Sequence, residues 1–167
     1  MAKLFKTSDD IYNEINEVWE STECSKIGVR LKVISTVKAK QILKLSKASA
    51  TTEYLIREQD VLTLVVYEEA WDRLSDLNKN LLLKGVFSVV SYDTEKERLI
   101  IDNRPYVDLF NMRHSKDASG KEYLDSYDNT LEAAALVIEQ IENEEREKKE
   151  EEKAQKAEAR AAKKSMK

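Results

Sequence analysis

One short segment constrains the fold of this chain more than any other. Seven consecutive residues, Val61–Tyr67, are aliphatic, β-branched or aromatic apart from one threonine, and no charge interrupts them. A run of this length and type is typical of a strand that is buried on both faces, because a strand with one solvated face shows polar residues at every second position. The segment therefore predicts a buried strand.

Two helices are predicted around this strand. In Thr7–Glu20 apolar residues recur at helical spacing, and Thr7 or Ser8 can cap the helix. The second helix, Asp76–Val90, follows Ser75, a good N-cap residue. Its predicted inward-facing residues are Leu77, Leu81, Leu82, Val86, Val89 and Val90. Gly85 in its middle costs about 1 kcal/mol against alanine, so we expect another part of the protein to approach closely there.

The remaining segments before residue 126 alternate between strands and loops. Gly28–Val37 alternates apolar and polar residues, which predicts a half-buried strand. Lys38–Lys47 allows either a second strand or a short helix. Tyr92–Lys96 is turn-like, Glu97–Asp102 predicts another strand, and Asn111–Asp125 is polar and predicts a loop.

The C-terminal third predicts one amphipathic helix and a charged extension. Asn129 and Glu132 form a capping-box pattern at the start of the helix Asn129–Ile141. Its apolar stripe consists of Leu131, Ala134, Ala135, Ile138 and Ile141. Beyond it, acid-first i,i+4 pairs favour a solvent-exposed helix that frays. We therefore expect an α+β fold, a small mixed sheet packed with helices, in a compact domain 1–141 with a charged helical tail 142–167.

Composition excludes several kinds of site. Cys24 is the only cysteine and His114 the only histidine, so neither an internal disulfide nor a cysteine-based zinc site can form. The N-terminus lacks the apolar region of a signal peptide, and no run has the length of a membrane span. The sequence also has no glycine-rich phosphate loop and no nucleophile elbow. The acidic residues Glu68, Glu69, Asp72 and Asp76 indicate a capped, solvated helix start rather than a cation site.

Charge leaves one alternative open. The net charge of −4 argues weakly against nucleic-acid binding, which needs clustered lysine and arginine. Yet the stretch Arg30–Lys47 holds six bases in 18 residues: Arg30, Lys32, Lys38, Lys40, Lys44 and Lys47. A nucleic-acid-associated module that uses this stretch is therefore a second hypothesis, beside the simpler interpretation of a solvated surface.

The segment Val61–Phe110 resembles a known family, the zincin-like metallopeptidases found in bacteriophage genomes. The resemblance lies in the order of a strand, an acidic link with the W-x-x-L turn Trp71–Leu74, and a helix that begins after Ser75. Paired leucines, Leu82 and Leu83, precede the position of the family's zinc motif. The resemblance implies a zincin-like core in which Val61–Tyr67 matches the family's edge strand.

The metal-binding residues of that family are missing here. Its H-E-x-x-H motif places two histidine ligands on one helix face, with a glutamate that activates the bound water. The matching positions hold Lys84, Gly85 and Ser88, and the third ligand falls near Pro105. We therefore expect no catalytic, cofactor-binding or metal-binding residues.

The resulting hypothesis is a non-catalytic accessory protein of phage origin that binds another protein, in the host cytoplasm or in a virion. A virion or assembly component whose charged tail orders against a partner is a further alternative, and an enzyme of another class stays open. The sequence predicts no membrane partner.

Overall fold

The computed structural model of the chain describes residues 3–49, 51, 53–54, 60–101 and 118–165, and for 118–125 and 157–165 it describes the backbone only. The expected α+β class is confirmed. In chain order the elements are β1 (Leu4–Lys6), α1 (Asp9–Glu20), α2 (Glu23–Lys26), β2 (Arg30–Thr36), β3 (Leu43–Lys47), β4 (Val61–Tyr67), α4 (Glu68–Asp72), α5 (Asp76–Ser88), β5 (Val90–Asp93), β6 (Arg98–Ile101) and α7 (Ala118–Ser165).

The main sheet has four strands in the order β1-β2-β4-β3. β2 and β4 run parallel at its centre, whereas β1 and β3 run antiparallel at its two edges. β4 is thus an interior strand, and five of its seven residues are buried, as the apolar run predicts, whereas Thr63 and Val65 on one face are half-buried. The resemblance placed the same segment at a sheet edge, and this placement is wrong because β3 covers the outer side of β4. The ambiguous segment Lys38–Lys47 contains a strand, not a helix.

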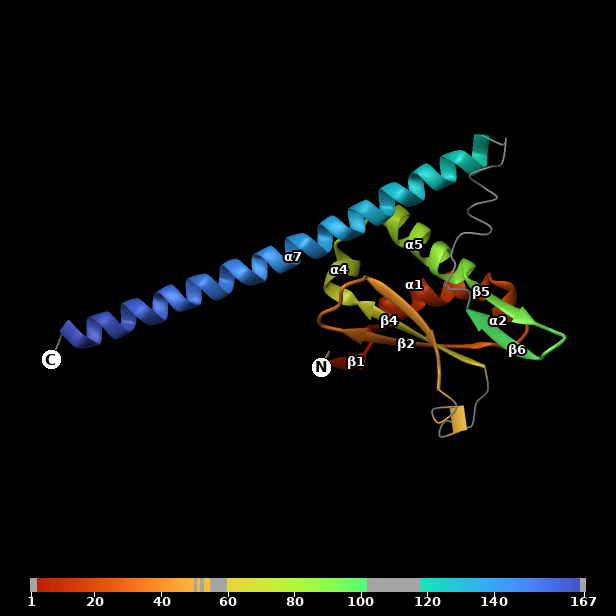
Figure 1. Ribbon diagram of the computed structural model, residues 1–167, viewed down its shortest axis with the longest axis horizontal. Coiled ribbons are helices and arrows are strands. Elements are labelled where there is room, and N and C mark those ends of the chain that lie inside the picture. Colours follow the sequence, from red (N-terminus) through yellow and green to blue (C-terminus); the bar gives the residue numbers. More distant parts are fainter. Residues whose placement is uncertain (1–2, 50, 52, 55–59, 102–117, 166–167) are drawn as a thin grey trace.

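The core lies on one face of this sheet, where α1 and α5 pack (Figure 1). Trp19 of α1 contacts Phe87 of α5 edge to face, with 5.1 Å between ring centroids. Trp71, in the short helix α4, is fully buried, and its indole Nε1 donates to Glu14 Oε2 at 3.1 Å. Both tryptophans are buried and therefore anchor their helices to the core.

The N-terminal segment differs from the sequence prediction. The helix begins at Asp9 instead of Thr7, and the Ser8 side chain makes no capping hydrogen bond. Thr7 is buried instead, and its hydroxyl oxygen lies within hydrogen-bond distance of Ser35 Oγ in β2, at 3.0 Å. The strand β1 precedes Thr7 and was not predicted. Leu4–Lys6 is too short to show a strand pattern in the sequence, and its pairing with β2 makes it a strand.

The end of α5 is also shorter than predicted. The helix ends at Ser88, and Val90 begins a strand that continues through the predicted turn residue Tyr92. This strand, β5, pairs antiparallel with β6 in a separate two-stranded sheet. Leu77 was expected inward but is 69% exposed, since it lies in the first turn of α5, outside the packed stripe.

Helix α7 corrects two predictions. It begins at Ala118, so the last part of the predicted loop Asn111–Asp125 is helical, and Asn129 with Glu132 lies inside the helix instead of capping it. The helix then runs without a break past Ile141 to Ser165. Its first half crosses α5 and α4, and its second half projects from the domain (Figure 1). No described helix is apolar enough over a sufficient length to cross a membrane.

Candidate functional site

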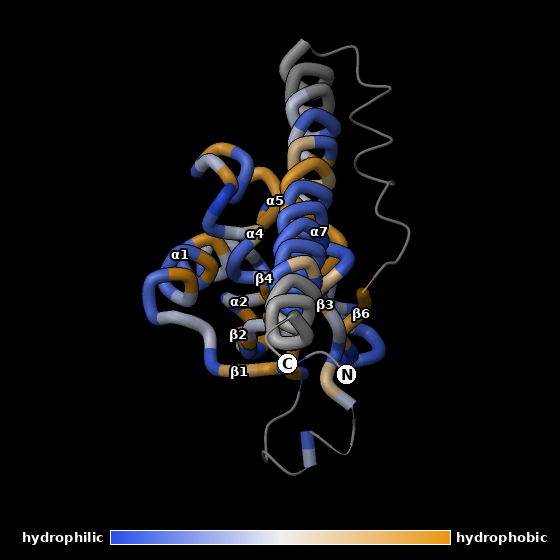
Figure 2. The backbone as a smooth tube through the Cα atoms, turned by 90° about the vertical axis from the view of Figure 1, so that its left-hand side faces the viewer, coloured by the Kyte–Doolittle hydropathy of each residue, from blue (hydrophilic) through white to orange (hydrophobic). Residues whose placement is uncertain are grey.

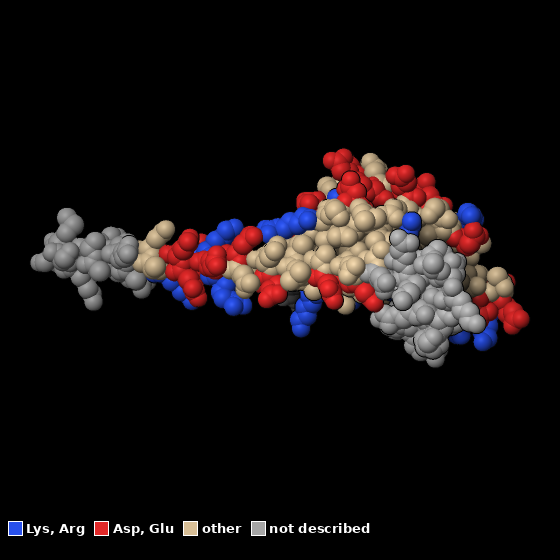
Figure 3. All heavy atoms as spheres, turned by 90° about the horizontal axis from the view of Figure 1, so that it is seen from above, with Lys and Arg blue, Asp and Glu red and all other residues tan. Residues whose placement is uncertain are grey.

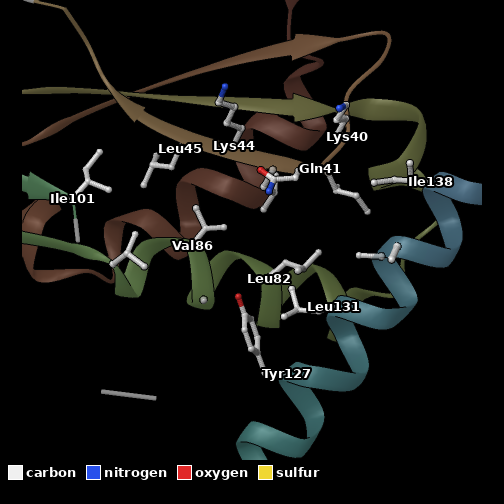
Figure 4. A pocket seen from close by; sticks show the side chains of 16 residues that line it. Lys40, Gln41, Lys44, Leu45, Leu82, Val86, Ile101, Tyr127, Leu131 and Ile138 are labelled. Atoms are coloured by element: carbon white, nitrogen blue, oxygen red, sulfur yellow. The ribbon is translucent and has the colours of Figure 1, made fainter. Parts of the chain in front are cut away.

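A groove lies between the edge strand β3, helix α5 and the first half of α7 (Figure 4). Its volume is about 540 Å³. Aliphatic side chains form most of its lining, together with alanines and one aromatic ring: Ile42, Leu43 and Leu45 near β3, Leu82, Val86 and Val89 on or after α5, Ile101 of β6, and Tyr127, Leu131, Ala134, Ala135 and Ile138 of α7. We call this feature the β3 groove.

The free edge of a strand forms one wall of the β3 groove. Six consecutive residues, 40–45, line it, and among the described strands β3 pairs only with β4. The backbone N–H of Tyr67 donates to the carbonyl oxygen of Ile42, and antiparallel pairing bonds alternate residues to the neighbouring strand. Leu43 and Leu45 therefore direct their backbone N–H and C=O groups toward the free edge.

Two lysines stand at the rim of the groove. Lys40 and Lys44 both line it and are both exposed, and neither forms an ion pair with a described residue. Gln41 lies between Lys40 and the strand and adds an uncharged polar group. The β3 groove thus combines an apolar floor, a row of backbone hydrogen-bonding groups and two positive charges.

Gly85 lies where Tyr127 of α7 packs on α5. A Cβ atom built on Gly85 would overlap the Tyr127 ring, so the glycine permits this approach. The close approach predicted from Gly85 is therefore confirmed, and its partner, Tyr127, lies outside every element predicted from the sequence. Tyr127 in turn forms one end of the β3 groove (Figure 4).

The positions that the resemblance assigns to zinc ligands do not meet in this groove. Lys84 and Ser88 are exposed and line a shallow depression beside α1 and α2, on a different side of α5 from Gly85. Pro105 and His114 lie outside the described residues. Among the residues that are described, no cluster of three or more His, Cys, Asp or Glu side chains could hold a metal ion.

The basic stretch Arg30–Lys47 does not form a single surface. Lys38 Nζ binds Glu145 Oε2 of α7 at 2.8 Å, and Lys47 Nζ lies 3.6 Å from Asp60 Oδ1. The strand register places Arg30, Lys32 and Lys44 on the sheet face that points away from α1 and α5. Three of the six bases therefore share a face, and the others are divided among ion pairs and the groove rim.

The remaining sequence candidates have structural roles. Glu68 accepts hydrogen bonds from Ser35 Oγ at 2.7 Å and from the Ser8 backbone N–H at 3.0 Å, which connects α4 to β2 and to the start of α1. Glu69 pairs with Arg73 at 3.0 Å. Cys24 is buried, and this burial raises the pKa of its thiol, so the thiolate that would act as a nucleophile is disfavoured.

Comparisons with known protein families, with curated proteins and with solved structures found no match for this chain.

Proposed function

We propose that the protein is a non-catalytic binding protein, and that the β3 groove takes an extended segment of a partner protein. The observation that carries this proposal is a strand edge that opens onto an apolar groove and has no partner strand in the part of the chain that the structure describes. A peptide laid along such an edge adds a strand to the sheet. Main-chain hydrogen bonds then supply affinity, and pockets for alternate side chains supply specificity.

The geometry of β3 fits this mode of binding. The outward backbone groups of Leu43 and Leu45 are two residues apart, so they match alternate residues of an added strand. Side chains on one face of that strand would contact Leu82, Val86 and Ile138, which line the groove. This alternation favours a peptide with apolar residues at every second position.

The charge at the rim adds a second requirement. Lys40 and Lys44 would lie beside the outward-facing side chains of the bound strand. Acidic residues between the apolar ones would complement these lysines, mainly by steering association and selecting partners. We therefore infer a partner segment that alternates apolar and acidic residues.

The absence of catalysis, the zincin-like ancestry, the phage origin and the location in host cytoplasm or virion remain part of this proposal. The order of a buried strand, an acidic link and a helix supports the ancestry, and Lys84, Gly85 and Ser88 support the loss of zinc chemistry. Elemental analysis of the purified protein tests the second point. We expect less than stoichiometric zinc after dialysis, and one tightly held zinc per chain would contradict it.

A pair of neighbouring substitutions on α7 tests the groove itself. Ala135 lines the groove, whereas the next residue, Leu136, is 58% exposed and does not line it. We expect Ala135→Trp to fill the groove, while Leu136→Trp adds the same indole at an exposed position outside the groove. Both variants thus introduce a tryptophan, but only one of them places it in the groove.

The probe is a library of random twelve-residue peptides selected against the wild-type protein. Enriched peptides should alternate apolar and acidic residues, bind the Leu136→Trp variant as tightly as wild type, and bind the Ala135→Trp variant at least about tenfold more weakly. Two results would overturn the proposal: no enrichment, or peptides that bind both variants equally. Circular dichroism of each variant checks that both remain folded.

The alternative of a nucleic-acid-associated module has weaker structural support than the β3 groove. The six bases of Arg30–Lys47 are divided among different surfaces, as described above. The alternative of an assembly component remains compatible with the projecting half of α7. It would be favoured if removal of the projecting half abolished partner recovery while peptide binding in the groove persisted.

A further inference from the structure

The sheet has a second exposed surface, whose strand positions share only Lys44 with the lining of the β3 groove. It is the face that points away from α1 and α5, and we call it the outer face. None of its strand positions in β1, β2, β3 or β4 holds an aspartate or glutamate, although the protein as a whole is acidic. Its charges are therefore all positive.

The register arranges one row of this face in a definite pattern. Lys6 lies opposite Ile34, Ile34 opposite Val65, and Val65 opposite Lys44, so the row crosses all four strands. The two central side chains are apolar and half-buried, and the two outer ones are exposed lysines. Adjacent strands lie about 4.8 Å apart, so the lysines are separated by roughly 14 Å.

The next positions along β2 extend the same charge. Arg30 and Lys32 precede Ile34 at every second residue along β2 and are both exposed. Lys6 also lies 3.0 Å from Asp9, but both of these side chains are almost fully exposed, and such a pair is weak and readily exchanged. The row thus presents two apolar side chains between Lys6 and Lys44, and β2 carries two further basic residues in line with Ile34.

We infer that the outer face binds an amphipathic acidic helix of a partner protein. A helix with its side chains is about 10–12 Å across, which fits between the two lysine margins. Its apolar stripe would cover Ile34 and Val65, and glutamates or aspartates on both flanks of the stripe would meet Lys6 on one side and Lys44 on the other. The pattern of charge and apolarity is the complement of this kind of helix.

A nucleic acid fits the same surface less well. Sequence-tolerant binding of single strands uses aromatic side chains on which bases stack. The only aromatic residue at an outer-face strand position is Tyr67, and it is 2% exposed. Phosphate groups would also leave the apolar pair Ile34 and Val65 uncovered. An amphipathic acidic helix, by contrast, would contact both the apolar pair and the two flanking lysines.

The test uses full-length protein and a labelled 18-residue peptide with leucines along one helix face and glutamates on both flanks. A peptide of the same composition in scrambled order controls for charge alone, and a 20-nucleotide DNA, single- and double-stranded, represents nucleic acid. We expect the patterned peptide to bind at least about tenfold more tightly than the scrambled one.

Matched variants locate the binding. Lys6→Glu with Lys44→Glu should weaken binding of the patterned peptide by about tenfold or more, because the charges of the two lysines that flank Ile34 and Val65 are reversed. Lys26→Glu with Lys96→Glu makes the same change of charge at exposed positions elsewhere and should weaken it by less than about threefold. Ile34→Thr keeps a β-branched residue and should weaken binding without a change of charge. Ala135→Trp, in the groove, should have no effect.

Four outcomes would overturn the inference. They are absence of binding by the patterned peptide, equal binding by the scrambled peptide, equal losses from the two charge-reversed pairs, and tighter binding of either DNA than of the peptide. The last result would instead assign the outer face to nucleic acid. Because Ala135→Trp separates the two surfaces, failure here leaves the proposal for the β3 groove intact.

Discussion

The two halves of α7 are one continuous helix, yet different forces determine them. In the first half, Ile141 is 2% exposed, Thr130 is 1% exposed, and Tyr127 packs on Gly85. The second half, after Glu145, has no buried residue among those whose side chains are described. Figure 3 shows the consequence, since uncharged atoms dominate where α7 crosses the domain and acidic and basic groups alternate along the projection.

Ion pairs between residues four apart stabilise the projecting half of α7. Lys149 Nζ lies 3.5 Å from Glu145 Oε2, and Lys156 Nζ lies 3.5 Å from Glu152 Oε2, as the i,i+4 spacing predicts. Each such pair contributes only a few tenths of a kcal/mol. Hydropathy changes at the same point, and the projection is hydrophilic (Figure 2). Tertiary packing thus fixes one half, whereas intrinsic helix preference supports the other.

The largest expected loss of stability comes from a substitution in the packed half of α7. Ile141→Ala removes a fully buried side chain, and we expect it to lower the free energy of unfolding by about 2–5 kcal/mol. Lys149→Ala, two turns further along, removes one exposed ion pair and should change stability by less than about 0.5 kcal/mol. Urea unfolding monitored by tryptophan fluorescence measures both. Similar losses for the two variants would contradict the contrast between the halves.

A smaller effect is expected where the packed half touches α5. Gly85→Ala places a methyl group against the Tyr127 ring, so we expect a loss of about 1–3 kcal/mol. The matched double variant replaces Tyr127 with alanine as well. In that background Gly85→Ala should instead stabilise by about 1 kcal/mol, because alanine favours a helix over glycine. Equal effects in both backgrounds would show that the ring does not approach Gly85.

The contrast also shows how far sequence analysis reaches. The buried run Val61–Tyr67 predicted an interior strand, and Gly85 predicted a close approach, because both depend on local chemistry. The start of α7 was misplaced, since Asn129 and Glu132 match a capping box and only the packing of Tyr127 and Thr130 on α5 shows that the helix is already formed there.

The β3 groove was missed for the same reason. The lining residues from β3 and from α7 lie more than 80 residues apart in the sequence, 40–45 against 127–138, and neither segment carries a motif that links them. The exposed apolar residue Leu131, which the sequence assigned to a packed stripe, is 40% exposed and lines the groove. The sequence signal for the groove was an apolar residue that the core leaves uncovered. The sequence alone does not show which apolar residue that is.

The smallest expected effect concerns the boundary between the two halves, where two ion pairs connect α7 to the domain. Arg73 donates to both carboxylate oxygens of Glu144 at 2.8 and 2.9 Å, and Lys38 donates to Glu145 at 2.8 Å. These hydrogen bonds hold the pKa of both carboxyl groups below the usual value of 4.5. Glu144 therefore binds Arg73 in place of the predicted i,i+4 partner Lys148.

The pH dependence follows from the direction of these shifts. Because the folded-state pKa values are lowered, the stabilisation is fully present above the unfolded value near 4.5 and is lost as the pH falls through the lower folded values. We expect wild type to lose more thermal stability between pH 7 and pH 3 than a Glu144→Gln, Glu145→Gln variant. Glu150→Gln with Glu151→Gln, the same change in the projecting half, should keep the full wild-type pH dependence. A flat difference between wild type and the Glu144, Glu145 variant across this range would mean that the ion pairs do not hold α7, and that its boundary is set by Ile141 alone.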